Sequence, residues 1–264
     1  MKDLTKINEH IHRLVVPYKD IFTTVYFIRD GENTIIFDTA SGPEDVENYI
    51  LPAMQELGIS GQSVKYVFIS HNHRDHAYGV ERLMAEYPHA RLVTGSDKLA
   101  AANEKYTTLI PKDGEPLMEH FRIITIPGHT KDSAALLDLR TNTLITGDCL
   151  QMYGIFGSEN WGSNIRYPAE HLTAVKKVST MEIDLVVTAH NYHPCGFMAA
   201  GKENVAVCLN ACVEPLLKVK QMILANPQME DAEIAQTYNE ADKVPTIGAH
   251  VPAAVRAAME AKKM

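Results

Sequence analysis

The sequence lacks the features of a membrane, secreted or nucleic-acid-binding protein. No run approaches the roughly 18 apolar residues that a membrane-spanning helix needs, and the first residues are polar, unlike the apolar core of a signal peptide. The 4 cysteines form no CxxC pair and no dense disulfide framework. The 25 basic and 33 acidic residues give a net charge of −8 without a basic cluster, whereas a phosphate backbone is bound through positive charge. We therefore expect a cytoplasmic protein that acts on a small molecule and binds neither membrane nor nucleic acid.

The sequence also has no internal repeat, no low-complexity tract and no linker rich in glycine and serine. Its 264 residues, of which 45% are hydrophobic, suit one α/β domain. Short apolar strands alternate with amphipathic helices, the first of them predicted at 43–57. We predict a single domain with a catalytic core of about 1–200 and a helical extension of about 201–264. The extension, with helices expected at 205–225, 232–239 and 252–262, would cap the pocket or form a homodimer contact.

Histidine and aspartate residues follow four of the predicted strands directly. The buried strand at 64–70 leads into the segment His71-Asn-His-Arg-Asp-His76, and three later strands each deliver one such residue. Loops at strand ends are where α/β folds place their chemistry, because a rigid sheet positions the side chains. We therefore expect seven residues to converge: His71, His73, Asp75, His76, His129, Asp148 and His190.

These residue types in this spacing indicate a metal site. His71 and His73 are two residues apart, so in extended backbone their side chains point the same way and can bind one ion. Asp75 and His76 come after the chain turns and can face a neighbouring position. Imidazole and carboxylate ligands suit zinc. An H-x-H-x-D-H string arises by chance in about one chain in a thousand of this length, so a metal site is the favoured interpretation.

Four motifs carry a resemblance to a known family. HNHRDH (71–76), IPGHT (126–130), TGDCL (146–150) and TAH (188–190) resemble, in this order, those of the metallo-β-lactamase-fold hydrolase superfamily. The likeness extends from about residue 10 to about residue 195 and looks nearest the glyoxalase II-like and lactonase-like branches. It implies an α/β fold, a four-layer αβ/βα sandwich with the metals at one edge, here with the C-terminal helical extension added.

The resemblance also implies a division of roles among the seven residues. His71, His73 and His129 would hold a first metal ion, Asp75, His76 and His190 a second, and Asp148 would bridge the two. FDTA (37–40) is similar to an early aspartate motif of the superfamily, which implies that Asp38 supports the metal loop from behind. The alternative for Asp38 is an ordinary turn residue after a strand.

The sequence differs from several branches of the superfamily, and these differences count against the functions of those branches. True β-lactamases of this fold generally replace one of the seven positions, whereas here all seven are filled. Diiron flavoproteins usually carry glutamate where this chain has His73, and no flavin domain is present in the sequence. RNA-processing relatives would show a basic surface, which the charge of −8 opposes. No glutathione-binding motif is evident, so the substrate stays open.

The expected chemistry is hydrolysis by a dinuclear centre. Two divalent ions, zinc with iron or manganese as alternatives, would lie about 3.5–4 Å apart and share a hydroxide that attacks a small ester, thioester or lactone. Asp75 would hydrogen-bond the nucleophile and pass its proton to the leaving group. A phosphodiesterase or nuclease, a diiron redox protein and a catalytically silent binding protein are the alternatives.

The segment after Asp148 and the residues after His190 supply candidate substrate contacts. Tyr153 would donate a hydrogen bond to a developing oxyanion, and Trp161 would offer contact surface on a lid. Arg166 would recognise an anionic group. The residues Tyr192 and His193 would lie near the metals. The alternatives are packing of the aromatic residues, a helix contact for Arg166 and a turn role for His193, while Cys149 is expected to pack in the core.

Overall fold

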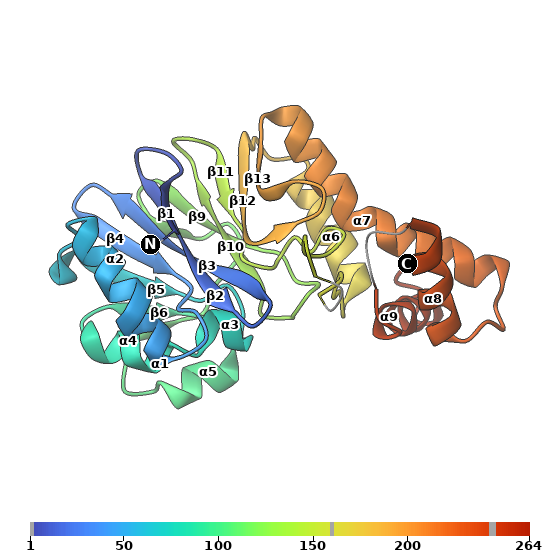
Figure 1. Ribbon diagram of the computed structural model, residues 1–264, viewed down its shortest axis with the longest axis horizontal. Coiled ribbons are helices and arrows are strands. Elements are labelled where there is room, and N and C mark those ends of the chain that lie inside the picture. The colour runs from blue at the N-terminus through green and yellow to red at the C-terminus, as the bar shows by residue number, and fades with distance from the viewer. Residues whose placement is uncertain (1–2, 159–160, 243–246) are drawn as a thin grey trace. The chain divides into compact units, whose positions relative to one another are not determined.

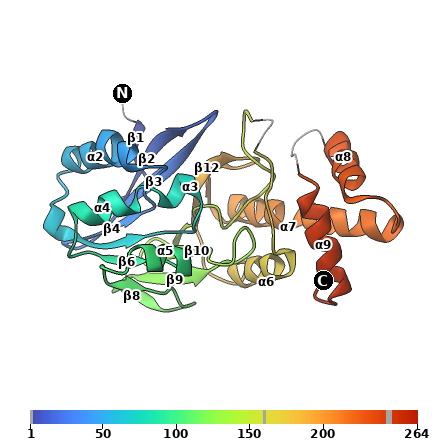
Figure 2. The same cartoon turned by 90° about the horizontal axis from the view of Figure 1, so that it is seen from below.

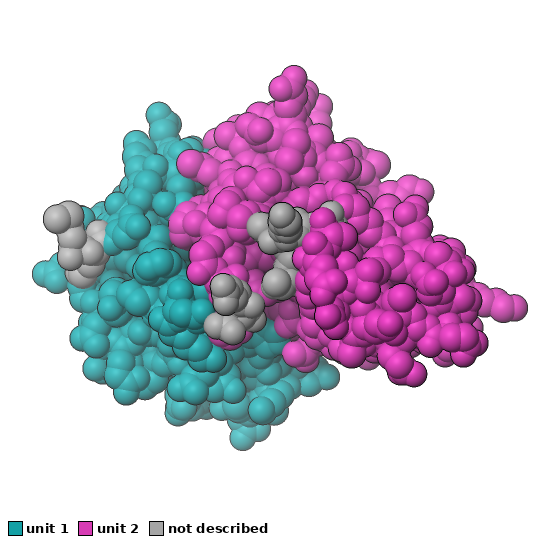
Figure 3. Space-filling view, turned by 45° about the vertical axis from the view of Figure 1, so that its right-hand side comes forward, with its two compact units in different colours: residues 1–125, 134–139 teal, residues 126–133, 140–264 magenta. Residues whose placement is uncertain are grey.

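The computed structural model describes residues 3–158, 161–242 and 247–264. The chain divides into two compact units, coloured separately in Figure 3. Unit 1 comprises Met1–Thr125 and Ala134–Leu139, and unit 2 comprises Ile126–Ser133 and Arg140–Met264.

Unit 1 contains a seven-stranded sheet whose strands follow chain order. Strands β1 to β4 pair antiparallel, and β4 to β7 pair parallel. The parallel half places the carboxyl ends of β4, β5 and β6 at one edge, where the loops leave the sheet. The strands are β1 (Asp3–Lys6), β2 (Ile11–Tyr18), β3 (Ile21–Asp30), β4 (Asn33–Phe37), β5 (Val64–Phe68), β6 (Arg91–Val93) and β7 (Thr108–Leu109).

Helices of unit 1 cover one face of this sheet (Figure 1). Phe27 and Ile36 point into a buried cluster with Met54 and Leu83 from the helices, while alternate residues turn to the other face, where Phe37 stacks on the ring of Phe68. This alternation follows from the two-residue period of a strand. The helical elements are α1 (Pro43–Asp45), the π-helix η1 (Val46–Ile50), α2 (Leu51–Glu56), the 3-10 helix η2 (Gly61–Ser63), α3 (Arg74–Ala77), α4 (Val80–Glu86) and α5 (Asp97–Ala102).

Unit 1 also contains three strands that pair antiparallel, namely β8 (Pro116–Met118), β9 (Phe121–Thr125) and β10 (Ala134–Asp138). They contact the first sheet through specific hydrogen bonds. The backbone N–H of Ala134 donates to the carbonyl of Ser70 at 2.9 Å, and Nδ1 of His120 lies 2.8 Å from Oδ1 of Asp30. The end of β5 is therefore tied to the start of β10.

Unit 2 combines a small sheet with four helices. Strand β11 (Thr143–Ile145) pairs parallel with β12 (Leu185–Tyr192), which pairs antiparallel with β13 (Gly196–Ala200). The helices are α6 (Pro168–Val178), α7 (Lys202–Ala225), α8 (Asp231–Asp242) and α9 (His250–Glu260).

The C-terminal helices of unit 2 have a core of their own. Helices α7, α8 and α9 pack against one another (Figure 2). The buried side chains of Leu216, Ile234, Tyr238 and Val251 form the core between them. The observed bounds agree with the three helices expected beyond residue 200. Among the described residues, no helix combines the length and apolar character that a membrane crossing would require.

Candidate metal centre

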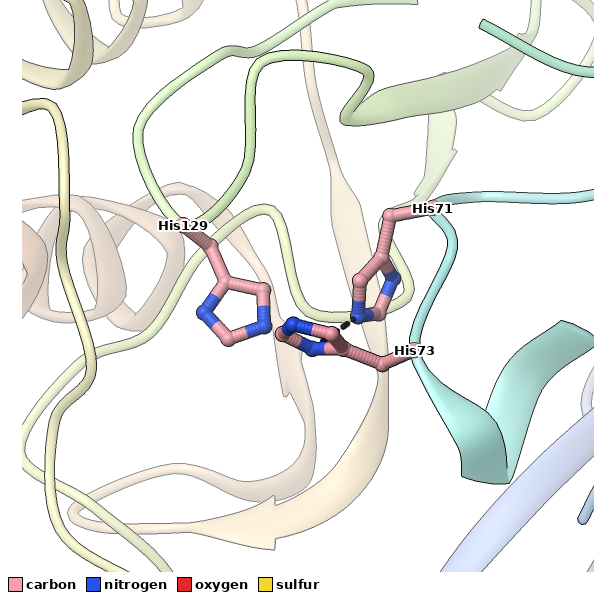
Figure 4. A group of neighbouring side chains, drawn as sticks. All are labelled: His71, His73 and His129. Atoms are coloured by element: carbon pink, nitrogen blue, oxygen red, sulfur yellow. Dashed lines mark hydrogen bonds between the residues drawn. The ribbon is translucent and has the colours of Figure 1, made fainter. Parts of the chain in front are cut away.

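The loop after β5 places two histidine rings against each other. Nε2 of His71 lies 2.9 Å from Nδ1 of His73, and Nδ1 of His71 lies 3.0 Å from the hydroxyl of Ser70. His73 keeps extended backbone immediately before α3, as expected for two side chains that point the same way. Figure 4 shows the rings of His71 and His73 together, joined by the dashed line between these two nitrogens. Two imidazole nitrogens at this separation are a donor pair for one cation.

Asp38 orients the next histidine from a fully buried position. Its carboxylate accepts hydrogen bonds from the backbone N–H of Ser70 at 2.7 Å and from the Ser70 hydroxyl at 2.9 Å, and it lies 2.8 Å from Nδ1 of His76. Burial raises the pKa of Asp38, and the imidazole of His76 opposes that rise. Because Asp38 engages Nδ1, Nε2 is the nitrogen of His76 that a metal would take, and it lies 3.3 Å from the carboxylate of Asp75.

Gly79 allows its own backbone segment to pack closely against that of Thr39, next to His76. Both the N–H and the hydroxyl of Thr39 donate to the carbonyl of His76, at 2.7 and 2.9 Å. A Cβ added at Gly79 would lie only 2.1 Å from the carbonyl oxygen of Thr39. Only glycine fits there without a shift of backbone, so Gly79 permits the contact between the turn after β4 and the start of α4.

Unit 2 supplies three further candidate ligands, all nearly buried. Nε2 of His129 lies 3.6 Å from Oδ2 of Asp148, and Nε2 of His190 lies 3.2 Å from Oδ1 of Asp148. Nδ1 of His129 donates to the carbonyl of Asn164 at 2.7 Å, which directs Nε2 toward Asp148. The two oxygens of one carboxylate therefore face two different imidazoles.

The candidate ligands form one group in each unit. His71, His73, Asp75 and His76 belong to unit 1, and His129, Asp148 and His190 belong to unit 2. All members except His73 are buried or nearly so. Five imidazoles and two carboxylates form a donor set that fits a borderline divalent cation such as zinc.

The model of the metallo-beta-lactamase superfamily matches residues 18–190, well over half of the chain. The chain belongs to the metallo-β-lactamase superfamily. The matched range contains all seven predicted ligands and Asp38.

One curated relative matches this chain over about half of its length. A hydroxyacylglutathione hydrolase from Citrobacter koseri is 29% identical over 149 residues, which are 53% of this chain and 53% of that protein. The match thus spans about half the length of that curated relative.

Solved structures confirm the predicted αβ/βα sandwich of the superfamily. The DIM-1 metallo-β-lactamase matches with a TM-score of 0.63 and 15% identity, over 81% of this chain and 98% of its own. A variant of a flavo di-iron protein from Thermotoga maritima matches with a TM-score of 0.64 and 13% identity, over 83% of this chain and 62% of its own. At these identities the matches establish the fold alone.

The predicted substrate-binding residues differ in burial and in their contacts. Tyr153 donates its hydroxyl proton to Glu214 on α7, and the side chain of Arg166 is exposed. Tyr192 is buried, whereas the ring of His193 packs on that of Phe156 with centroids 3.4 Å apart. Trp161 is half-buried and Cys149 is fully buried. The substrate roles of these residues stay predictions.

Sequence reasoning missed three residues that hold the candidate ligands in place. Ser70 contacts both Asp38 and His71, and the backbone of Asn164 accepts from His129. Gln151 donates to the carbonyl of Asp148. Ser70 directly precedes the histidine motif, and this adjacency is the one signal that could have indicated its role.

Proposed function

We propose that this protein is a dinuclear metal-dependent hydrolase that cleaves a small ester, thioester or lactone. The observation that carries the proposal is the placement of Asp148, whose two oxygens face His190 and His129 at 3.2 and 3.6 Å. A carboxylate turned to two separate imidazoles suits a bridge between two ions. Membership of the superfamily supports the same interpretation.

The ligands divide into two sets under this proposal. His71, His73 and His129 would hold one ion, and Asp75, His76 and His190 the other. Asp148 would contact both. Zinc is the expected metal, because five of the seven ligands are imidazoles. Iron or manganese are the alternatives.

The chain's own residues would orient and move protons in the reaction. When bound, the two ions supply polarisation of the scissile carbonyl and a water whose pKa is lowered toward neutrality. Asp75, whose carboxylate lies beside Nε2 of His76, would accept the proton of the attacking water and return it to the leaving group. Asp38 would keep the proton of His76 on Nδ1 and so keep Nε2 as a ligand.

The net charge and one sequence relative support the proposed substrate class. A net charge of −8 without a basic cluster disfavours nucleic acids. The relative from Citrobacter koseri is a hydroxyacylglutathione hydrolase, which supports a thioester or a related carboxylic ester as substrate. We also propose that the protein works without a nucleic-acid or membrane partner and that the C-terminal helices serve a homodimer or cap the pocket.

The test is a substrate panel on purified protein loaded with zinc. Lactones, thioesters and simple esters are expected to turn over, and turnover is expected to stop when a chelator removes the metal. Turnover of phosphodiesters with no activity on carboxylic esters would contradict the proposed substrate class. An iron-bound protein with a visible absorption band and oxygen-reducing activity would instead identify a diiron redox protein.

A further inference from the structure

Gln151 lies three residues beyond Asp148, and its side chain is buried in unit 2. Its amide nitrogen donates to the carbonyl oxygen of Asp148 at 3.1 Å and to the hydroxyl of Tyr192 at 3.1 Å. Its amide oxygen accepts from the backbone N–H of Asn164 at 3.0 Å. A glutamine amide has two N–H donors and one carbonyl, so both donors are used and the acceptor is occupied.

Each partner of Gln151 leads to a different proposed ligand. The first partner is the backbone of Asp148 itself. Asn164 accepts a hydrogen bond from Nδ1 of His129 at 2.7 Å through its own carbonyl. Tyr192 follows His190 by two residues on β12, and its ring meets the His190 ring edge-on with centroids 5.7 Å apart. The Gln151 side chain thus contacts Asp148 directly and reaches the other two proposed ligands of unit 2, His129 and His190, through one intermediate residue each.

The orientation of this amide is fixed by its surroundings. If the amide were flipped, its nitrogen would face the N–H of Asn164 and its oxygen would face the carbonyl of Asp148, so that like groups would meet. An unsatisfied buried donor or acceptor is destabilising, so the observed arrangement is strongly favoured. Tyr192 and Asn164 are thereby held at fixed distances from Asp148.

We propose that Gln151 is a positioning residue that sets the spacing of His129, Asp148 and His190 for metal binding. The inference rests on the proposed metal centre, and it concerns a residue that contacts no metal itself. Groups that hold metal ligands in place typically contribute 10- to 100-fold to metal affinity. Gln151 is therefore expected to act on the affinity and release rate of the metal, in addition to any effect of its loss on the stability of the metal-free fold.

The experiment measures zinc affinity by competition with a chromophoric chelator in Gln151→Leu, alongside thermal unfolding of the metal-free protein. Gln151→Leu is expected to bind zinc about 10- to 100-fold more weakly than the wild type. Gln236→Leu is the matched control, because Gln236 also donates through its side-chain amide, to Glu240 at 2.8 Å, at an exposed site on α8. Its zinc affinity is expected to equal that of the wild type.

A second, milder variant covers the case in which Gln151→Leu does not fold. Tyr192→Phe removes one hydroxyl and leaves the ring in place, and a loss of zinc affinity of up to about tenfold is expected. The inference is overturned if Tyr192→Phe binds zinc as tightly as the wild type and Gln151→Leu, where it folds, does so too. A lower stability of the metal-free variants does not change this outcome. A wild type that takes up no zinc overturns the proposed centre and this inference together, so the two failures are distinguishable.

Discussion

Asp38 lies 2.8 Å from Nδ1 of His76, although 38 residues separate them in the sequence. The same carboxylate receives both the backbone N–H and the hydroxyl of Ser70. It therefore fixes both ends of the loop that carries the histidine motif. We expect this relationship to control the second proposed metal position, where His76 would bind through Nε2.

Asp38→Asn is the first test of that role. The neutral amide no longer holds the His76 proton on Nδ1 by charge, so zinc affinity at one of the two positions is expected to fall about 10- to 100-fold. Titration with a competing chelator measures the change. Asp113→Asn is a matched control, because Asp113 accepts the N–H and hydroxyl of Thr125 at an exposed site. Equal zinc affinity in the two variants would rule out the supporting role of Asp38.

His73→Ala tests the first proposed metal position. Its ring nitrogen lies 2.9 Å from that of His71, and loss of this ligand is expected to reduce kcat/KM on the order of a hundred- to a thousandfold, as the loss of a key electrostatic group does. Unfolding in urea is expected to change little. Steady-state kinetics with His89→Ala, an exposed histidine, provides the comparison. Full activity of His73→Ala would contradict the assignment.

Gly79→Ala tests the close backbone approach behind His76. The new methyl group would meet the carbonyl oxygen of Thr39 at 2.1 Å and a methyl of Val46 at 2.7 Å. Overpacking of this kind costs about 1–3 kcal/mol, so the free energy of unfolding is expected to fall by that amount. Gly42→Ala is the control, because a Cβ there meets only the flexible end of Glu44. Equal stability of the two variants would show that the backbone has room at Gly79.

The pH dependence of stability has a specific source in α6. Burial lowers the pKa of His171 to about 4, whereas an unfolded histidine titrates at 6.5. Below pH 6.5 the unfolded chain therefore binds more protons at this position, and stability is lost as the pH falls toward 4. The expected contribution is about 2 kcal/mol between pH 7 and pH 5.

Urea unfolding of the wild type and of His171→Leu at both pH values isolates this contribution. The variant is expected to lose about 2 kcal/mol less on acidification, because all other titrating groups are shared. The same pH dependence in both proteins would place the loss of stability in other groups.

Much of the candidate site could be predicted because the ligands follow apolar strands. His129 and Asp148 each follow a buried strand within a few residues, as predicted, whereas His190, predicted to follow its strand, lies within β12 itself. The supporting residues have no comparable signal. The hydrogen bond from Gln151 to Tyr192 joins residues 41 positions apart, and no periodicity indicates it.

The helices are also predicted only in part from the sequence. The helix predicted at 43–57 is interrupted by the π-helix η1 before α2. Pro52 stands in the first turn of α2 and has no N–H to donate to the preceding turn, which disfavours a continuous α-helix there. The extension beyond residue 200 agrees better, because the apolar stripe of α7 meets a core that α8 and α9 complete.

The most direct measurement of the central claim is the zinc content of the purified chain before and after substitution of Asp148. The wild type is expected to bind two equivalents of zinc and to lose its esterase activity when they are removed. Asp148→Ala is expected to bind less zinc and to be inactive while remaining folded. A wild type that binds no zinc, or that hydrolyses esters equally well without metal, would contradict the account.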